Sequence, residues 1–387
     1  MNSDTSPART TEFDNHATPA ARVNSLNYRA RYNLAAVEQK RQHEPDLVPF
    51  WRWPMGIDTQ KTVCEVVDGL QCSPIFATPS FFSKLPGMPA FNRLFVTGRD
   101  RARFLHNFCT NDVVGLPAGQ AVEAFFTDVK ARVLAHGYVL AFADHHEILL
   151  LSADTEPLRR HLDRYIITED VHLEIITSTE TRFLTQQQAL QRLTPTLTNV
   201  PDQLGQCCSY SLSEGHLTAL SIRWFQTALC VLCGSEALLQ SLFAESASGE
   251  LSVDEVQTLR IRERFPIVGV DLTNEHLAPE ADRNATAISF KKGCYLGQEP
   301  IARIDALGHI NRALRCVMAQ MDPGTELGEN PVVQHDNGTV LGTITSSIRV
   351  APQALAGLAI LRLASLDRPS IVIDSAGGEF PVIEIAT

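Results

Sequence analysis

The chain has 387 residues, 44% of them hydrophobic, with 33 basic and 44 acidic side chains and a formal net charge of −11. This apolar content supports a sizeable core and excludes a mostly disordered chain. No apolar run approaches the roughly 18 residues that span a bilayer, so no membrane partner is expected. The acidic balance argues against direct nucleic-acid binding, which needs clustered Lys and Arg.

The first 90 residues carry few signs of regular structure. Residues 1–45 mix small, polar and charged side chains, which is typical of a poorly docked tail. Residues 46–90 hold Trp51, Trp53 and several prolines, and we expect them to pack irregularly. The start of the chain lacks the basic-then-apolar pattern of a secretory signal, and its acids are unlike a transit peptide. We therefore predict a flexible or irregular extension at 1–90.

From residue 93 the hydrophobic periodicity predicts strands interrupted by helices. Asp100 is expected to cap the first helix, and Ser252 with Glu255 has the capping-box pattern. The pair Asp144-His145 predicts a hairpin whose histidines are solvated. Strands are expected at 93–97, 121–129, 132–143, 146–152, 171–177, 216–224 and 227–233. Helices are expected at 101–108, 154–167, 186–193, 235–243 and 252–265. This order predicts an α+β fold of mixed antiparallel sheets and helices.

The pattern changes at residue 312. Six short alternating runs, separated by Gly, Pro, Asn and Asp, occupy roughly 75 residues from here to the end. Asp336-Asn337-Gly338 is a hairpin turn signal within them. The sequence therefore predicts a small antiparallel β-barrel or sandwich as a separate domain at 312–387.

The cysteines suggest a reducing environment. There are nine, an odd number at irregular spacings, which does not fit a disulfide scaffold. Cys230 and Cys233 form a CxxC, but it lies in an apolar strand where residues three apart face opposite sides, so no metal or redox use is expected. Cys207-Cys208 is interpreted as part of a loop. We expect the bacterial cytoplasm, or the mitochondrial matrix if the chain is eukaryotic.

The most unusual segment is 287–303, AISFKKGCYLGQEPIAR, which follows an apolar run interpreted as a strand. Gly293 and Gly297 flank a Cys-Tyr pair, so the backbone can turn tightly or approach a ligand. Lys292 and Arg303 would lower the pKa of the thiol if they lay near it. Amide and carboxylate groups of the Gln-Glu pair can bind the edge of a heterocycle. The alternative is a loop with a buried cysteine.

The stretch FKKGCYLGQEPIAR resembles the KGCYxGQE signature of the YgfZ family, folate-binding relatives of the glycine-cleavage T-protein. Four other segments resemble the family in the same order. They are GRDRARFLHNFCTND (98–112), TLRIRERFPIVGVDL (258–272), GHINRALRCV (308–317) and GTITSSIRVAPQALAGLAILRL (342–363). The resemblance covers about 90–387 and implies a T-protein-like fold, with two intertwined subdomains at 91–311 around a funnel that holds tetrahydrofolate or another reduced folate, followed by the barrel.

The family also implies a function and a set of site residues. Members take part in iron–sulfur cluster assembly or repair and, in bacteria, support certain tRNA modifications through cluster enzymes, so iron–sulfur assembly or client proteins are the expected partners. The signature thiol maps onto Cys294. The residues that would shape the site or hold folate are Lys292, Gly293, Tyr295, Gly297, Gln298, Glu299, Arg303, Asn111, Asp112 and Arg260. An arginine suits the glutamyl tail, because it pairs bidentately with carboxylates. No metal site is predicted.

Departures from the family leave other functions open. The catalytic Asp of the T-protein aligns with Ala135, which cannot act as a base, and His136 follows it. Arg262 and Arg264 stand where the family has Glu and Gly. One alternative is a folate-dependent one-carbon transferase that uses another base, such as His136 or Glu299. The other is an interaction module that has lost folate.

Overall fold

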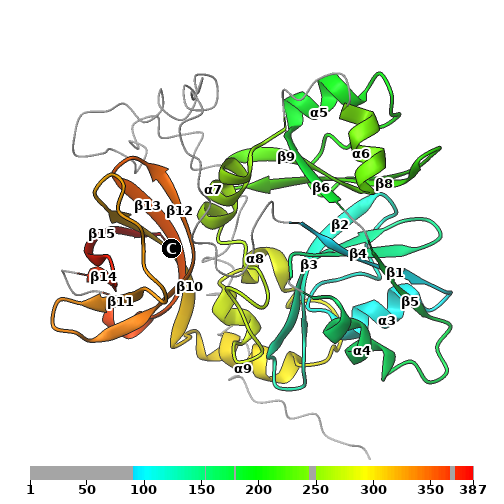
Figure 1. Ribbon diagram of the computed structural model, residues 1–387. Helices are drawn as coiled ribbons and strands as arrows, with labels where there is room; N and C mark the ends of the chain where they lie inside the picture. The colour runs from blue at the N-terminus through cyan, green and yellow to red at the C-terminus, as the bar shows by residue number, and fades with distance from the viewer. Residues whose placement is uncertain (1–89, 153, 178–179, 244–249, 367–370, 387) are drawn as a thin grey trace, which may run out of the picture. The chain divides into compact units, whose positions relative to one another are not determined.

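The computed structural model describes residues 90–386, except 153, 178–179, 244–249 and 367–370, and all of these belong to one structural unit, Pro79–Thr387. The predicted N-terminal extension lies outside the described residues, save its last position. Within this unit the chain forms two antiparallel sheets, a helical segment and a closed barrel, so the predicted α+β class is confirmed (Figure 1).

The first sheet has five antiparallel strands in the order β2-β3-β4-β1-β5. Its strands are β1 (Asn92–Thr97), β2 (Gln120–Thr127), β3 (Val133–Ala141), β4 (His146–Leu150) and β5 (His172–Ile176). Helices α3 (Arg101–Phe108) and α4 (Glu156–Asp163) bury Phe104, Leu105, Leu158 and Leu162 against one face (Figure 1). All seven elements were predicted, because their apolar periodicity is strong.

The second sheet has four strands in the order β6-β9-β8-β7. They are β6 (Glu180–Thr185), β7 (Cys207–Leu212), β8 (Gly215–Trp224) and β9 (Thr227–Gly234). Helices α5 (Gln186–Leu193) and α6 (Glu236–Phe243) pack on its outer face. The interpretation of Cys207-Cys208 as a loop was wrong, because this polar stretch pairs with β8 along its whole length.

The inner faces of the two sheets pack against each other. An aromatic cluster fills the space between them, with ring centroids 5.1–6.4 Å apart. Its members are Phe91, Tyr138, Phe183, Trp224 and Phe265. Cys233 belongs to this core, whereas Cys230 lies in the core beneath α5 and α6. The CxxC cysteines therefore face opposite sides of β9, as predicted.

A helical segment connects the sheets to the barrel. It contains α7 (Val253–Glu263), the 3-10 turn η2 (Ala278–Ala281), α8 (Asn284–Ala287) and α9 (Gln298–Leu307). The capping box of Ser252 and Glu255 is present at the start of α7. The expectation of a strand before the signature was wrong, because this run is a short helix and a coil. Asp100 occupies the N-cap position of α3, as predicted, but its carboxylate accepts from the amide of Asp170 (2.9 Å) instead of from an amide of the helix.

The C-terminal strands close into a six-stranded antiparallel barrel, β10-β13-β12-β11-β14-β15. They are β10 (Arg312–Gln320), β11 (Val332–His335), β12 (Val340–Ala351), β13 (Ala354–Arg362), β14 (Ile371–Ser375) and β15 (Gly378–Ala386), with the turn η3 (Leu363–Ser365) after β13. Alternate apolar side chains fill the interior, which explains why the alternation in sequence predicted a barrel. Within the described residues, no helix is long and apolar enough to span a bilayer.

Candidate site around the signature cysteine

The signature loop is fixed against the end of α3 and the end of β2. The amide of Ser289 donates to the carbonyl of Thr110 (2.8 Å), and the amide of Leu296 donates to that of Asn107 (2.9 Å). The hydroxyl of Thr127 donates to the carbonyl of Leu296 (2.9 Å). Both ends of the loop are thus held by segments far away in the sequence.

The ammonium group of Lys292 is the central anchor of this loop. It is buried and donates to the carbonyls of His106, Cys109 (2.8 Å) and Asn111 (2.8 Å), and it lies 4.9 Å from the ring centroid of Tyr295. Burial lowers the pKa of Lys292, while the three carbonyls compensate the desolvated charge. All three of these hydrogen bonds go to backbone oxygens, so Lys292 holds the backbone of residues 106–111.

Gly297 allows the loop to turn into α9. Its φ of +85° lies in the left-handed region, and a Cβ here would stand 2.5 Å from the carbonyl oxygen of Asp128 and from Oγ1 of Thr127. Glycine meets both conditions at this position. Gly293 is different, since a Cβ there would meet only a ring nitrogen of His106, at 3.9 Å. The two signature glycines therefore have unequal structural roles.

Cys294 lies at the exposed side of this fixed loop. Among the seven cysteines in the described residues, it is the exposed one, and Cys208 alone of the others is partly accessible. The sequence alternative of a buried signature cysteine is therefore wrong. The side chain of Tyr295 next to it points inward and is buried, so the two neighbouring residues face opposite ways.

The residues after the cysteine form the start of α9. Gln298 is partly exposed, whereas Glu299 and Arg303 are exposed. Glu299 and Arg303 are four residues apart on one helix, so they share a face. The structure therefore presents an amide, a carboxylate and a guanidinium in one helical segment directly after the thiol.

Asn111 and Asp112 have structural partners beside the loop. The side-chain amide of Asn111 donates to the carbonyls of Glu123 and Thr286, both at 2.9 Å, and thereby joins β2 to α8. A carboxylate oxygen of Asp112 accepts from the amide of Gly115 (3.0 Å), and the side chain stays half exposed. Asp112 thus has a solvent-facing carboxylate, whereas Asn111 is used within the fold.

Arg260 is buried and links the helical segment to its surroundings. It donates to the side chains of Gln257 and Asp271 (both 2.7 Å) and to the carbonyl of Phe265 (3.0 Å), and only 1% of it is exposed. Asp271 also accepts from the hydroxyls of Thr345 and Ser346 on β12. We therefore assign Arg260 to the connection between α7 and the barrel and omit it from the candidate folate contacts.

The chain is similar in sequence to proteins of two bacteria. It is 24% identical to the tRNA-modifying protein YgfZ of Colwellia psychrerythraea over 234 residues, covering 60% of this chain and 70% of that protein. It is also 24% identical to the tRNA-modifying protein YgfZ of Escherichia coli over 261 residues, covering 66% of this chain and 78% of that protein. The chain is a homologue of the YgfZ proteins. No family model matches it.

The fold of this YgfZ homologue is that of the glycine-cleavage T-protein. The aminomethyltransferase T of Bartonella henselae superposes with a TM-score of 0.63, covering 76% of this chain and 83% of that protein at 14% sequence identity. This likeness confirms the expected T-protein-like architecture. At this identity, the comparison shows the fold alone.

A buried charged cluster was missed by the sequence analysis of this YgfZ homologue. Arg283 forms a bidentate pair with the carboxylate of Glu123, and Nε2 of His136 lies 2.7 Å from the same carboxylate. Burial favours the neutral acid, but the charge and hydrogen bonds of Arg283, and then His136, lower the pKa of Glu123 to about 2. Burial lowers the pKa of His136. Glu123 and Arg283 are 160 residues apart, so no local pattern indicated the pair.

Ala135 and His136 point to opposite faces of β3. Ala135 packs in the core beneath α3 and α4, and His136 lies against Phe125 and Phe265 on the other side. Neither residue offers an exposed base: the first has no ionisable group, and the second is fully buried and bonded to Glu123. Glu299 is exposed but lies on α9, outside this cluster.

The two arginine departures occupy the end of α7. Arg264 closes the helix in the left-handed conformation with φ 58°, where glycine is the usual residue. Arg262 lies over the ring of Phe225, 5.2 Å from its centroid. Glu263 between them accepts from Arg283 (3.1 Å) and from the amide of Phe225 (2.7 Å). Arg262 therefore packs on Phe225, Arg264 lies 3.9 Å from the carboxylate of Asp282, and Glu263 is turned toward the buried charged cluster.

Proposed function

We propose that this YgfZ homologue is a folate-binding accessory protein of iron–sulfur cluster assembly or repair, and that it supports cluster enzymes that modify tRNA. The observation that carries the proposal is the exposed thiol of Cys294 on a loop whose backbone is fixed at both ends. A thiol held this way meets a partner without an ordering cost for the loop. The names of its relatives agree with a link to tRNA modification.

The thiol would serve as a transient ligand or reactive group. A permanent cluster takes about four cysteinyl ligands, and in the described residues only Cys294 is exposed among the cysteines. A cluster bound here would therefore share its ligands with a partner protein. The unpaired state of the described cysteines agrees with a reducing compartment such as the bacterial cytoplasm.

The first turns of α9 fit a reduced folate. The exposed guanidinium of Arg303 would pair with a carboxylate of the glutamyl tail, and the exposed carboxylate of Glu299 would accept from amino groups of the pterin. The partly exposed amide of Gln298 offers both a donor and an acceptor. A bound folate would supply a one-carbon carrier or a redox-active pterin, and these side chains would orient it beside the thiol.

Aminomethyl transfer is the less favoured alternative. It needs a base, and the position aligned with the catalytic Asp of the T-protein is Ala135, buried in an apolar core. The ring of His136 is sequestered with Glu123 and Arg283. The interaction-module alternative predicts no folate binding, so a titration with tetrahydrofolate distinguishes it from the folate-binding proposal.

The test is a calorimetric titration of tetrahydrofolate into the wild-type chain, Cys294→Ala and Arg303→Ala, with Arg223→Ala on β8 as an exposed matched control. We expect wild type, Cys294→Ala and the control to bind alike, and Arg303→Ala to bind about tenfold more weakly or worse. Absence of binding to wild type would refute the folate part and favour the interaction module.

The role of the thiol is tested separately. An oxidatively damaged iron–sulfur tRNA-modifying enzyme is restored with and without the chain, and its activity is followed. We expect wild type to accelerate the recovery and Cys294→Ala to have no effect. Equal acceleration by both proteins would refute the assignment of Cys294, and a stoichiometric cluster that stays with the purified chain would refute the transient role.

A further inference from the structure

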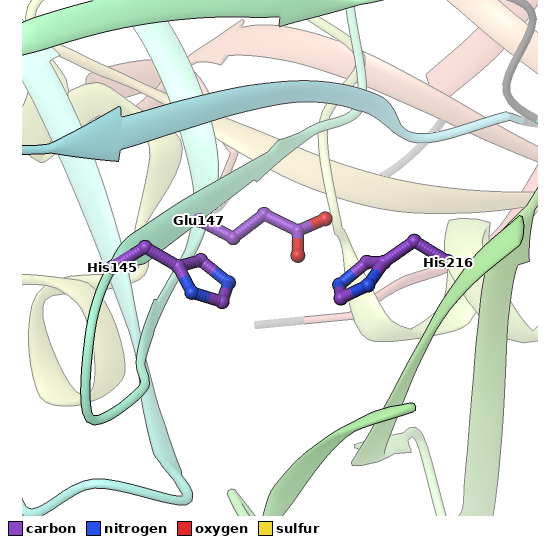
Figure 2. A group of neighbouring side chains, drawn as sticks. All are labelled: His145, Glu147 and His216. Atoms are coloured by element: carbon purple, nitrogen blue, oxygen red, sulfur yellow. The ribbon is translucent and has the colours of Figure 1, made fainter. Parts of the chain in front are cut away.

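Three potential metal ligands converge at one edge of the packed sheets, on elements other than the signature loop. His145 precedes β4, Glu147 lies on β4, and His216 lies near the start of β8. One ligand atom from each lies within 4.8 Å of the others, and Figure 2 shows the two rings and the carboxylate pointing toward a common gap. The group joins the five-stranded sheet to the four-stranded sheet.

Neighbouring side chains orient the ring of His145. Its Nδ1 lies 2.7 Å from the carboxylate of Asp144, and its ring stacks between Phe95 (centroids 4.9 Å apart) and Phe142 (4.7 Å). The prediction of solvated histidines at this hairpin was wrong, since only 10% of the His145 side chain is exposed and His146 is buried. Its Nε2 is buried and has no hydrogen-bond partner among the residues that the structure describes. A carboxylate on one nitrogen with the other left open is the usual arrangement behind a metal-binding histidine.

The other two ligands are equally constrained. Glu147 is fully buried, and its carboxylate accepts from Arg93 and from the hydroxyl of Thr218 (2.8 Å), one bond on each oxygen. Each oxygen keeps a second lone pair. Nε2 of His216 lies 2.8 Å from the hydroxyl of Ser209, which orients this partly exposed ring.

We propose that His145, Glu147 and His216 form a binding site for a divalent transition-metal ion of the zinc class. Two imidazoles and one carboxylate are a recurrent ligand set for zinc, with water at the open position. Magnesium and calcium do not fit, because they require six or more oxygen ligands. The bound ion would cross-link the two sheets at their edge, which is independent of folate and of Cys294.

The surroundings set the strength of the site. The guanidinium of Arg93 neutralises Glu147, so the ion enters a set of ligands without net charge. Tetrahedral zinc places its ligand atoms about 3.3–3.5 Å apart. The ligand atoms here lie up to 4.8 Å apart, so the side chains must approach one another by up to about 1.5 Å. We therefore expect reversible binding whose affinity rises from Mn²⁺ through Co²⁺ to Cu²⁺.

The experiment is a titration of the chelator-treated full chain with Zn²⁺ by calorimetry and with Co²⁺ by absorption. The variants are His145→Gln, His216→Gln and Asp144→Asn, with His172→Gln as control because its side chain is 79% exposed on β5. We expect one saturable site in wild type and in the control. Asp144→Asn should bind about 10–100-fold more weakly, as for other outer-shell partners, and the two histidine variants should lose more than about 100-fold.

The spectrum distinguishes this site from the exposed thiol. Cobalt held by His145, Glu147 and His216 gives visible ligand-field bands without a thiolate charge-transfer band. A thiolate band, unchanged binding in both histidine variants, or no saturable binding to wild type would each overturn the proposal. Weaker binding by Asp144→Asn cannot be explained by misfolding, because this side chain is 87% exposed and is not itself a ligand. The metal-free variants should unfold at the same temperature as metal-free wild type, which shows that weaker metal binding does not come from misfolding.

Discussion

Replacing Lys292 by methionine tests whether one buried ammonium holds the signature loop. Met keeps most of the apolar stem but removes all three donors to the carbonyls of His106, Cys109 and Asn111. The neighbouring Lys291 is exposed, so Lys291→Met is a matched control with the same chemistry.

The magnitude follows from the acceptors left behind. The carbonyl of Asn111 still accepts from the thiol of Cys109, so two carbonyls, those of His106 and Cys109, lose the donor given by Lys292. An acceptor left unsatisfied in the interior costs about 1–3 kcal/mol, so we expect Lys292→Met to lower the free energy of unfolding by about 2–6 kcal/mol. An exposed substitution such as Lys291→Met should stay within about 0.5 kcal/mol of wild type.

Two assays measure the result. Urea denaturation gives the free energy of unfolding of both variants, and amide hydrogen exchange over 289–296 and 106–111 reports opening of the loop. We expect faster exchange in both segments for Lys292→Met alone. If the two variants differ by less than about 1 kcal/mol and their exchange is equal, the anchoring role of Lys292 is refuted.

Three further outcomes are expected. The lowered pKa of Glu123, from about 4.5 in the unfolded chain to about 2, stabilises the fold above pH 4.5, and this stability is lost as the pH falls toward 2. Glu123→Gln should remove that acid sensitivity and cost about 3–5 kcal/mol at pH 7 in urea denaturation, because Arg283 loses its bidentate carboxylate and keeps only the contact with Glu263. An unchanged loss of stability between pH 4.5 and 2 in this variant would contradict the prediction. Gly297→Ala should lower the unfolding free energy by about 2–4 kcal/mol in thermal scans, through backbone strain and a close carbonyl contact, whereas Gly293→Ala should be near neutral; equal effects would contradict the assignment. Arg264→Gly should stabilise by about 0.5–1 kcal/mol, since it relieves a left-handed arginine, and a loss of stability would show that the side chain matters more.

The elements that could be predicted share strong local patterns. Helix α7 followed from its capping box, and the barrel followed from alternating runs with turn signals. The missed elements lack such patterns. Strand β7 reads CCSYSL with little apolar alternation and exists because it pairs with β8. Helix α9 was hidden by glycines at both ends, with Pro300 in its first turn, where a missing amide is tolerated.

The sequence by itself determined the fold class, the barrel, the relation to the YgfZ proteins and the position of Cys294 within a distinctive motif. These properties reside in short-range periodicity and in contiguous residues. Only the tertiary structure decided that Lys292 anchors backbone, that Arg260 is buried, and that His145 and Glu147 meet His216. Such outcomes depend on which distant segments pack together and on the need of each buried charge for a partner, and neither is encoded in spacing along the chain.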